Sequence, residues 1–187
     1  PVAAGLGGGS SDAAAVLSAL NSCCGQPLSQ TKLLEIAGTL GADVPFFIYG
    51  QPAWATGTGT TLTPLPPLPE VYYLLLNPGF SVSTPWVYQS LQLTKGGELA
   101  NLPRFSVNTL PELLDALHND LELVTSERYA EIDEMKEFLR ANGALGTLMS
   151  GSGASVFGVF PDMGTAEKAK LAIPAELAWK AFVVRPI

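Results

Sequence analysis

The sequence predicts an α+β protein made of two domains. In its second part, strand-like apolar runs and helical patterns follow the order β-α-β-β-α-β once additional helices are set aside, which is the ferredoxin-like split unit. In its first part, a glycine-rich stretch leads directly into a helix-forming run. A proline-rich segment, Pro64 to Pro69, lies between the two parts, and proline is excluded from central strands. We therefore expect domains at residues 1–65 and 66–187.

The composition is that of an ordinary globular chain. Its 187 residues are 47% hydrophobic and 14% charged, which is sufficient for a well-filled core. The net charge of −7, with no block of Lys or Arg, argues against a nucleic-acid or anionic-membrane partner. No apolar run approaches the length of a membrane span. The adjacent Cys23 and Cys24 lack metal-ligand spacing and indicate free thiols in a reducing compartment.

The glycine-rich stretch, Pro1 to Leu17, has the properties of a phosphate-binding loop. Its glycines permit positive φ and leave the backbone amides open to a ligand; they are Gly5, Gly7, Gly8 and Gly9. Ser10, Ser11 and Asp12 then provide capping oxygens for a helix that runs to about Leu20, is apolar nearly all round and is expected to be buried. Unpaired amides and the positive end of a helix dipole suit an anion, so we expect a nucleotide phosphate. The alternative is a glycine-rich turn without a ligand.

Three familiar phosphate-binding patterns do not fit this stretch. The dinucleotide fingerprint G-x-G-x-x-G meets Ser10 in place of its third glycine. The pattern G-x-x-x-x-G-K-[ST] lacks its lysine, and the H-R-D and D-F-G motifs of protein kinases are absent from the sequence.

A lone carboxylate, Asp43, follows the second predicted helix. That helix has apolar residues at helical spacing, Ser29 or Thr31 as its cap and Gly41 at its end. Asp43 then precedes an apolar run, where burying an acid without a partner is costly. Either the carboxylate stabilises the turn by accepting hydrogen bonds from backbone amides, or it has a catalytic role.

The elements of the second part are indicated by periodicity and by caps. Strands are expected at about 71–76, 147–150, 155–160 and 180–184, and helices at about 86–91, 110–118, 127–142 and 166–171. Thr109 and Glu112 have capping-box spacing, and Gly143 suits the end of the long helix. The earlier G-x-G at 57–59 precedes no helix pattern and predicts a turn between strands.

Three polar segments of the second part have bland interpretations. Residues 150–155 form a glycine loop between two strands, which is either an ordinary hairpin turn or part of a phosphate site. Residues 119–122 are interpreted as a helix-end turn with solvated acids. The charged residues between 131 and 137 are interpreted as a solvated helix face.

Three segments resemble motifs of the GHMP kinases, which include galactokinase and the homoserine, mevalonate and phosphomevalonate kinases. P-V-A-A-G-L-G-G-G-S-S-D-A-A, from Pro1, is similar to the family's P-x-x-x-G-L-G-x-S-S-A. G-A-D-V-P-F-F, around Asp43, and M-S-G-S-G-A-S-V-F-G, from Met149, are similar to two other family segments. The resemblance implies the GHMP kinase fold, with part of an N-terminal ribosomal-protein-S5-domain-2-like domain ahead of the C-terminal ferredoxin-like domain.

The resemblance also implies roles for individual residues. Asp43 would face the accepting hydroxyl as a general base or orienting group. Tyr88 would stack on a cytosine unless it belongs, with Trp86, to the helix core, and Thr84 and Pro85 would accompany it as substrate contacts. The residues implied to bind the nucleotide are Pro1, Val2, Ala3, Ala4, Gly5, Leu6, Gly7, Gly8, Gly9, Ser10, Ser11, Gly151, Ser152 and Gly153.

The longer form G-L-G-G-G-S-S-D-A-A resembles the branch of the family that acts in non-mevalonate isoprenoid biosynthesis. The implied reaction transfers the γ-phosphoryl of ATP, with Mg²⁺, to the 2-hydroxyl of a cytidine-diphosphate-linked methylerythritol, in a cytoplasmic or plastid-stromal monomer or homodimer. The alternatives are a homoserine or mevalonate-type kinase of the same family, or a non-catalytic nucleotide-binding protein.

Because the chain begins at Pro1 inside the motif, we expect a fragment that lacks the family's N-terminal lysine and has little kinase activity alone.

Overall fold

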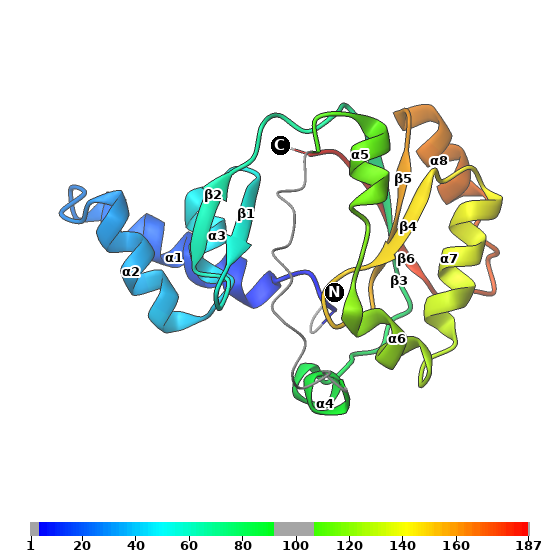
Figure 1. Cartoon of the computed structure of the whole chain (residues 1–187), viewed down its shortest axis with the longest axis horizontal. Helices are drawn as coiled ribbons and strands as arrows, with labels where there is room; N and C mark the ends of the chain where they lie inside the picture. Colours follow the sequence, from blue (N-terminus) through cyan, green and yellow to red (C-terminus); the bar gives the residue numbers. More distant parts are fainter. Residues whose placement is uncertain (1–3, 92–106, 187) are drawn as a thin grey trace, which may run out of the picture. The chain divides into compact units, whose positions relative to one another are not determined.

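The computed structural model describes residues 4–91 and 107–186, which form two compact units. One unit is Gly7–Pro67, and the other combines residues 4–6 with residues 68–186 (Figure 1). The division therefore falls inside the glycine-rich stretch and again inside the proline-rich segment. The domain boundary expected after residue 65 stays a prediction.

The unit Gly7–Pro67 contains three helices and a hairpin. Its elements are α1 (Gly8–Cys23), α2 (Gln30–Leu40), α3 (Val44–Tyr49), β1 (Ala53–Thr56) and β2 (Thr61–Pro64). The two strands pair antiparallel, with Ala53 opposite Pro64. The predicted turn between strands is confirmed, and its Gly57 and Gly59 have φ of 67° and 92°.

Helix α1 is less buried than its apolar sequence predicts. Its buried residue, Ala14, packs with Ala37 of α2 and Val44 of α3. Val16 and Leu20 are 60% and 59% exposed. The prediction of a buried helix is wrong, because α2 and α3 cover one stripe of α1 and leave another apolar stripe uncovered within this unit.

Helix α2 begins and ends where the sequence predicts, and a further helix follows it. The Ser29 side chain accepts a hydrogen bond from the Lys32 amide at 3.3 Å, and Gly41 is the C-cap. The apolar run after Asp43, which the sequence left unassigned, forms α3. Pro45 lies in its first turn, where the missing N–H of proline has no helical partner to lose.

The other unit is built on a four-stranded antiparallel sheet. Its strands are β3 (Tyr72–Asn77), β4 (Gly146–Met149), β5 (Val156–Phe160) and β6 (Lys180–Val184). They lie in the order β4-β5-β3-β6, which confirms the ferredoxin-like split β-α-β unit. The crossover helices are α7 (Glu131–Ala141) and α8 (Met163–Leu171), and the additional ones are α4 (Thr84–Ser90), α5 (Leu110–Asp115) and α6 (Asp120–Ser126).

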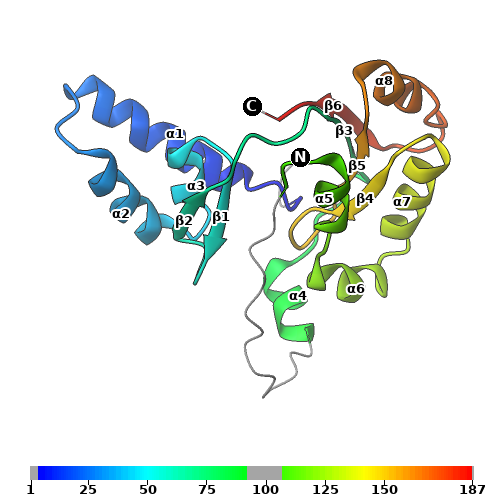
Figure 2. The same ribbon diagram turned by 45° about the horizontal axis from the view of Figure 1, so that its top comes forward.

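Helices cover both faces of this sheet. On one face, α7 and α8 pack on β3 and β5 in the main core, whose fully buried side chains include Leu74, Ile132, Met135, Leu139 and Phe160. On the other face, Leu113 of α5 packs against Val71 and Val159. Figure 2 shows α5 and the α7 and α8 pair on opposite sides of the strands.

The sequence predicts the helix caps better than it predicts which charged side chains are buried. The capping box of Thr109 and Glu112 is present, and Gly143, with φ 94°, follows the end of α7. The interpretation of residues 119–122 as a helix-end turn is wrong: Asn119 caps the start of α6 by accepting from the Leu121 amide at 3.0 Å. The solvated-face interpretation fails at Lys136, which is buried.

Candidate active site

The first turn of α1 has backbone amides without a side-chain cap. Gly7 is the N-cap, in the left-handed region with φ 63°, and no side chain among the described residues makes a capping hydrogen bond there. The Ser11 amide donates to the Gly7 carbonyl at 2.8 Å, so the amides between them precede the helical hydrogen bonds. A Cβ on Gly8 or Gly9 would meet nothing within 4 Å. This open, amide-rich helix start suits an anion.

The predicted capping role of the serines is wrong. Ser10, Ser11 and Asp12 lie inside α1, because the glycine run itself becomes helical from Gly8. Their side chains therefore leave the first amides to a ligand or to water. The correction strengthens the phosphate interpretation, since a side-chain cap would compete for the same N–H groups.

Gly7 is glycine for two reasons. Its positive φ disfavours any residue with a Cβ, and a Cβ there would lie 3.0 Å from the ring of Phe47. Phe47 belongs to α3, which packs against α1. The helix that follows Asp43, α3, thus packs against the N-cap of α1 through Phe47.

Asp43 is an exposed carboxylate at the start of α3. It occupies the N-cap position with φ −86°, but its side chain makes no capping hydrogen bond. The alternative in which Asp43 holds this turn through a cap is therefore not what the structure has. The carboxylate is accessible for contact with a ligand.

Gly5 is in contact with the loop between β4 and β5. The Ser150 hydroxyl donates to the Gly5 carbonyl at 2.8 Å, and the Ser155 amide donates to the Ala4 carbonyl at 3.2 Å. Gly5 has φ 74°, and a Cβ there would overlap the carbonyl oxygen of Ser150. The beginning of the first glycine-rich stretch is therefore in contact with the glycine loop between β4 and β5, in a form that requires glycine at position 5.

The same loop bonds to α4. Thr84 Oγ1 and Ser152 Oγ are 2.8 Å apart, which is a hydrogen bond between two hydroxyls. Ser152 is buried, whereas Gly151 and Thr84 are exposed. The structure thus joins a predicted substrate residue to a predicted nucleotide residue.

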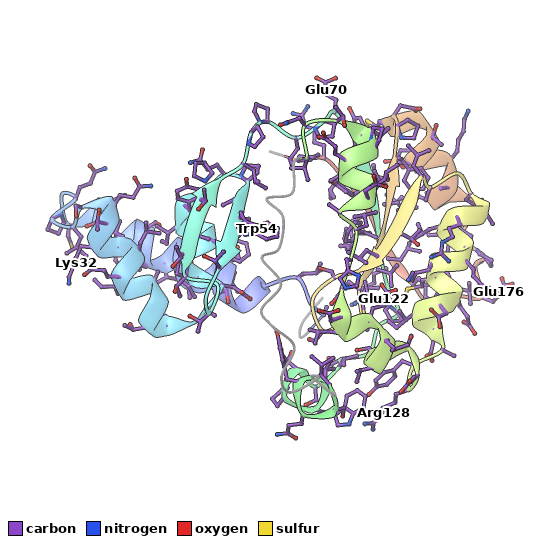
Figure 3. All side chains as sticks on the ribbon, in the orientation of Figure 1. Lys32, Trp54, Glu70, Glu122, Arg128 and Glu176 are labelled. Carbon is purple, nitrogen blue, oxygen red and sulfur yellow. The ribbon has the colours of Figure 1, made fainter. Side chains whose placement is uncertain are left out.

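Trp86 and Tyr88 of α4 have different surroundings. Trp86 packs against the main core, its ring edge-to-face with Tyr129 at 6.3 Å and 4.6 Å from the guanidinium of Arg128, which Figure 3 labels. Tyr88 is 60% exposed. The helix-core alternative therefore applies to Trp86 and not to Tyr88, whose ring is open to a stacking partner. Pro85, also exposed, lies in the first turn of α4.

The predicted site residues are divided between the two units. The unit Gly7–Pro67 contains Gly7, Gly8, Gly9, Ser10, Ser11 and Asp43. The other unit contains Ala4, Gly5, Leu6, Thr84, Pro85, Tyr88, Gly151, Ser152 and Gly153. Pro1, Val2 and Ala3 lie outside the described residues.

Neither a metal cluster nor a membrane span is found in the part of the chain that the structure describes. Within residues 4–91 and 107–186, no group of three or more His, Cys, Asp or Glu could hold a metal ion. Over the same ranges, no helix has both the length and the apolar character needed to cross a bilayer.

Two family descriptions match this chain. Residues 1–51 match the GHMP kinases N terminal domain, and residues 99–178 match GHMP kinases C terminal. The chain belongs to the GHMP kinases. Within that family, it is 54% identical over 187 residues to a 4-diphosphocytidyl-2-C-methyl-D-erythritol kinase of Syntrophotalea carbinolica, and 50% identical to one of Geobacter sp. strain M21. Each comparison covers 100% of this chain and 66% of the relative, so the chain spans just under two thirds of those proteins.

Solved structures confirm the predicted GHMP kinase fold. A crystal structure of 4-(cytidine 5'-diphospho)-2C-methyl-D-erythritol kinase superposes with a TM-score of 0.80 at 36% identity, covering 100% of this chain and 68% of that one. A homoserine kinase from Cytophaga hutchinsonii reaches a TM-score of 0.79 at 21% identity, covering 100% of this chain and 67% of that one, and shares the fold.

Proposed function

We propose that this chain provides nucleotide-binding and acceptor-activating elements of an ATP-dependent kinase that phosphorylates the 2-hydroxyl of 4-diphosphocytidyl-2-C-methyl-D-erythritol. The reaction would serve non-mevalonate isoprenoid precursor biosynthesis. The observation that carries the proposal is the 54% identity over all 187 residues to a relative of that name. Two features of the structure support it: the uncapped, glycine-rich start of α1, and the carboxylate of Asp43, which makes no capping hydrogen bond.

The phosphates of the nucleotide are assigned to the glycine-rich stretch. The amides at the start of α1 would bind phosphate oxygens, while Gly151, Ser152 and Gly153 would support this segment from the β4–β5 loop. Mg²⁺, when bound with ATP, would neutralise part of the phosphate charge. The hydroxyl of Ser11, near the start of α1, is an oxygen ligand of the kind that Mg²⁺ binds.

The acceptor is assigned to Asp43 and α4. Asp43 would orient the 2-hydroxyl and take its proton as that oxygen bonds to the γ-phosphorus of ATP, while the bond from the γ-phosphorus to the β–γ bridging oxygen breaks and ADP leaves. Tyr88 would stack on the cytosine, and its exposed ring supports that role. Thr84 and Pro85 would contact the same substrate at the start of α4.

A panel of alcohols tests the proposed function. We would assay the 187-residue chain alone and completed with the part of the Syntrophotalea carbinolica relative that it does not span. With Mg²⁺ and ATP, the completed chain should phosphorylate 4-diphosphocytidyl-2-C-methyl-D-erythritol and leave homoserine and mevalonate unmodified. Preference for either other alcohol, or ATP binding without transfer to any of them, would overturn the assignment.

Replacement of Gly9 by alanine should separate stability from nucleotide binding. Gly9 is helical and a new Cβ meets no neighbour, so the change should raise the free energy of unfolding by about 0.5–1 kcal/mol. If phosphates approach these amides, the same methyl group obstructs them and the Kd for Mg²⁺–ATP should rise about tenfold or more.

The matched control is Gly38→Ala in α2, where a Cβ makes only ordinary contacts, the nearest 3.7 Å from Thr60. It should stabilise the chain equally without weakening nucleotide binding. Calorimetric titration with Mg²⁺–ATP and urea unfolding give the two quantities. Equal nucleotide affinity in both variants would remove the start of α1 from the binding site.

A further inference from the structure

One face of α6 bonds to β4 and to the loop that follows it. The side chains of Asn119, Glu122 and Thr125 are spaced by three residues, so they share one side of the helix. Their backbone partners lie 27 to 32 positions further along the chain. The sequence pattern of a cap followed by an acid could have predicted the start of α6, but not these partners.

At Met149, two side chains of α6 take the place of a neighbouring strand. β4 lies at the edge of the sheet. Glu122 Oε2 accepts from the Met149 amide at 2.7 Å, and Asn119 Nδ2 donates to the Met149 carbonyl at 2.9 Å. Both peptide groups on the open edge are therefore satisfied at the last residue before the loop.

The loop itself is also held by α6. Asn119 Nδ2 donates to the Gly151 carbonyl at 2.8 Å, and the single hydrogen of the Thr125 hydroxyl is shared between the Leu121 carbonyl of its own helix at 3.1 Å and the Ser152 carbonyl at 3.3 Å. Gly151 and Gly153 have φ of 55° and 90°, and glycine loses more backbone freedom than other residues when it is ordered. Bonds from outside the loop therefore matter for keeping it in one conformation.

Glu122 is fixed by a second partner on α7. Its Oε1 accepts a hydrogen bond from the ammonium of Lys136, and the two side chains are only 17% and 11% exposed. Figure 3 shows Glu122 where α6, β4 and α7 meet. A carboxylate held at both oxygens by charge-assisted or amide donors has a defined position, so it can define the position of Met149.

The far end of this set of bonds is Gly5. The loop bonds to the Gly5 carbonyl through Ser150 and to the Ala4 carbonyl through Ser155. We propose that Asn119 and Glu122 are positioning residues that act through the β4–β5 loop to set the backbone of Gly5, and thereby the entry to the phosphate-binding segment. The effect on ATP rests on the proposed function, whereas the effect on Gly5 does not.

Asn119→Ser tests the proposal while sparing the helix. Serine is a good N-cap and can still accept from the Leu121 amide, but it lacks the Nδ2 donor to Met149 and Gly151. We expect hydrogen exchange at the amides of Gly153 and Ser155 to become about tenfold faster. The free energy of global unfolding should fall by much less than the free-energy change that corresponds to this tenfold effect. The measurement uses the 187-residue chain and needs no activity.

The matched control is Asp162→Ser. Asp162 caps α8 by accepting from the Thr165 amide at 2.8 Å, and it has no bond to the β4–β5 loop among the hydrogen bonds found for the described residues. It should leave exchange at Gly153 and Ser155 unchanged. If Asn119→Ser does not fold, Asn119→Asp provides the same test, because it is nearly isosteric, keeps the cap oxygen and loses both donations.

Kinetics of the completed chain give the second reading. Asn119→Ser should raise KM for ATP about tenfold and change KM for the alcohol less than twofold. Unchanged exchange at Gly153 and Ser155 would overturn the positioning role. Faster exchange with an unaltered KM for ATP would overturn its link to the nucleotide. If the completed wild-type chain does not transfer phosphate from ATP to the alcohol, the proposed function is refuted. The exchange experiment on the 187-residue chain still decides the role of Asn119.

Discussion

Replacement of Asp43 by alanine is expected to lower kcat of the completed chain by about 10²- to 10⁴-fold. The carboxylate is exposed at the N-cap of α3 and makes no capping bond, so the change removes a chemical group without removing a cap interaction. Phosphoryl transfer often has a loose transition state, in which alignment and charge neutralisation matter more than a strong base. We therefore expect a loss toward the lower end of this range, with the Kd for Mg²⁺–ATP within about twofold of wild type.

Asp43→Asn separates the two proposed roles of this residue. The amide oxygen can still accept a hydrogen bond from the alcohol, but the group cannot take its proton. Recovery of most of the rate would assign Asp43 to orientation, and a loss equal to that of alanine would assign it to proton transfer. Glu35→Ala is the control, because Glu35 is an exposed acid of the same unit whose ion pair among the described residues is with Lys32. An Asp43→Ala enzyme with the wild-type rate would remove this residue from the mechanism.

Replacement of Lys136 by methionine is expected to lower the free energy of unfolding by about 3 kcal/mol. It leaves the carboxylate of Glu122 largely buried, with the Met149 amide as its remaining hydrogen-bond donor among the described residues. A charge buried without its partner is among the costlier defects in a core, although the 17% exposure of Glu122 keeps the effect below the largest values. Urea unfolding of the 187-residue chain measures the change.

The double variant Glu122→Gln with Lys136→Met should recover most of that loss. Glutamine can still accept from the Met149 amide, and no unpaired charge remains. We expect its unfolding free energy to lie within about 1 kcal/mol of wild type. If the effects of the two substitutions simply add, the residues do not form a coupled pair and the anchoring of Met149 by Glu122 must be weaker than its geometry indicates.

Local rules predicted much of this fold because they depend on neighbouring residues. The capping box of Thr109 and Glu112 and the cap of α2 at Ser29 occur where the sequence places them. The order of strands and crossover helices along the chain in the ferredoxin-like unit follows from the alternation of periods in the sequence. The capping rule did not predict the start of α1. The helix begins at Gly8, ahead of the serines, because glycine permits the helical conformation as readily as others.

The charged residues were predicted less well, because burial depends on what packs against a side chain. Lys136 and its neighbours in α7 have the pattern of a solvated face, yet Lys136 meets Glu122 of α6 inside the unit. The opposite error occurred in α1, where Val16 and Leu20 have the composition of core residues and are exposed. Neither the burial of Lys136 nor the exposure of Val16 and Leu20 can be predicted from the residues adjacent in the sequence.

The sequence by itself determined the family, the glycine segments, the lone acid after α2 and the order of the elements. These follow from motifs, from permitted φ values and from periodicity, all of which are properties of short stretches. Only the tertiary structure decided that Lys136 fixes Glu122, that Glu122 and Asn119 bond to Met149, that Asn119 also bonds to the β4–β5 loop, and that this loop bonds to Gly5. The physical reason is that the partners of a polar side chain are chosen by which distant segments the folded core brings within hydrogen-bond distance.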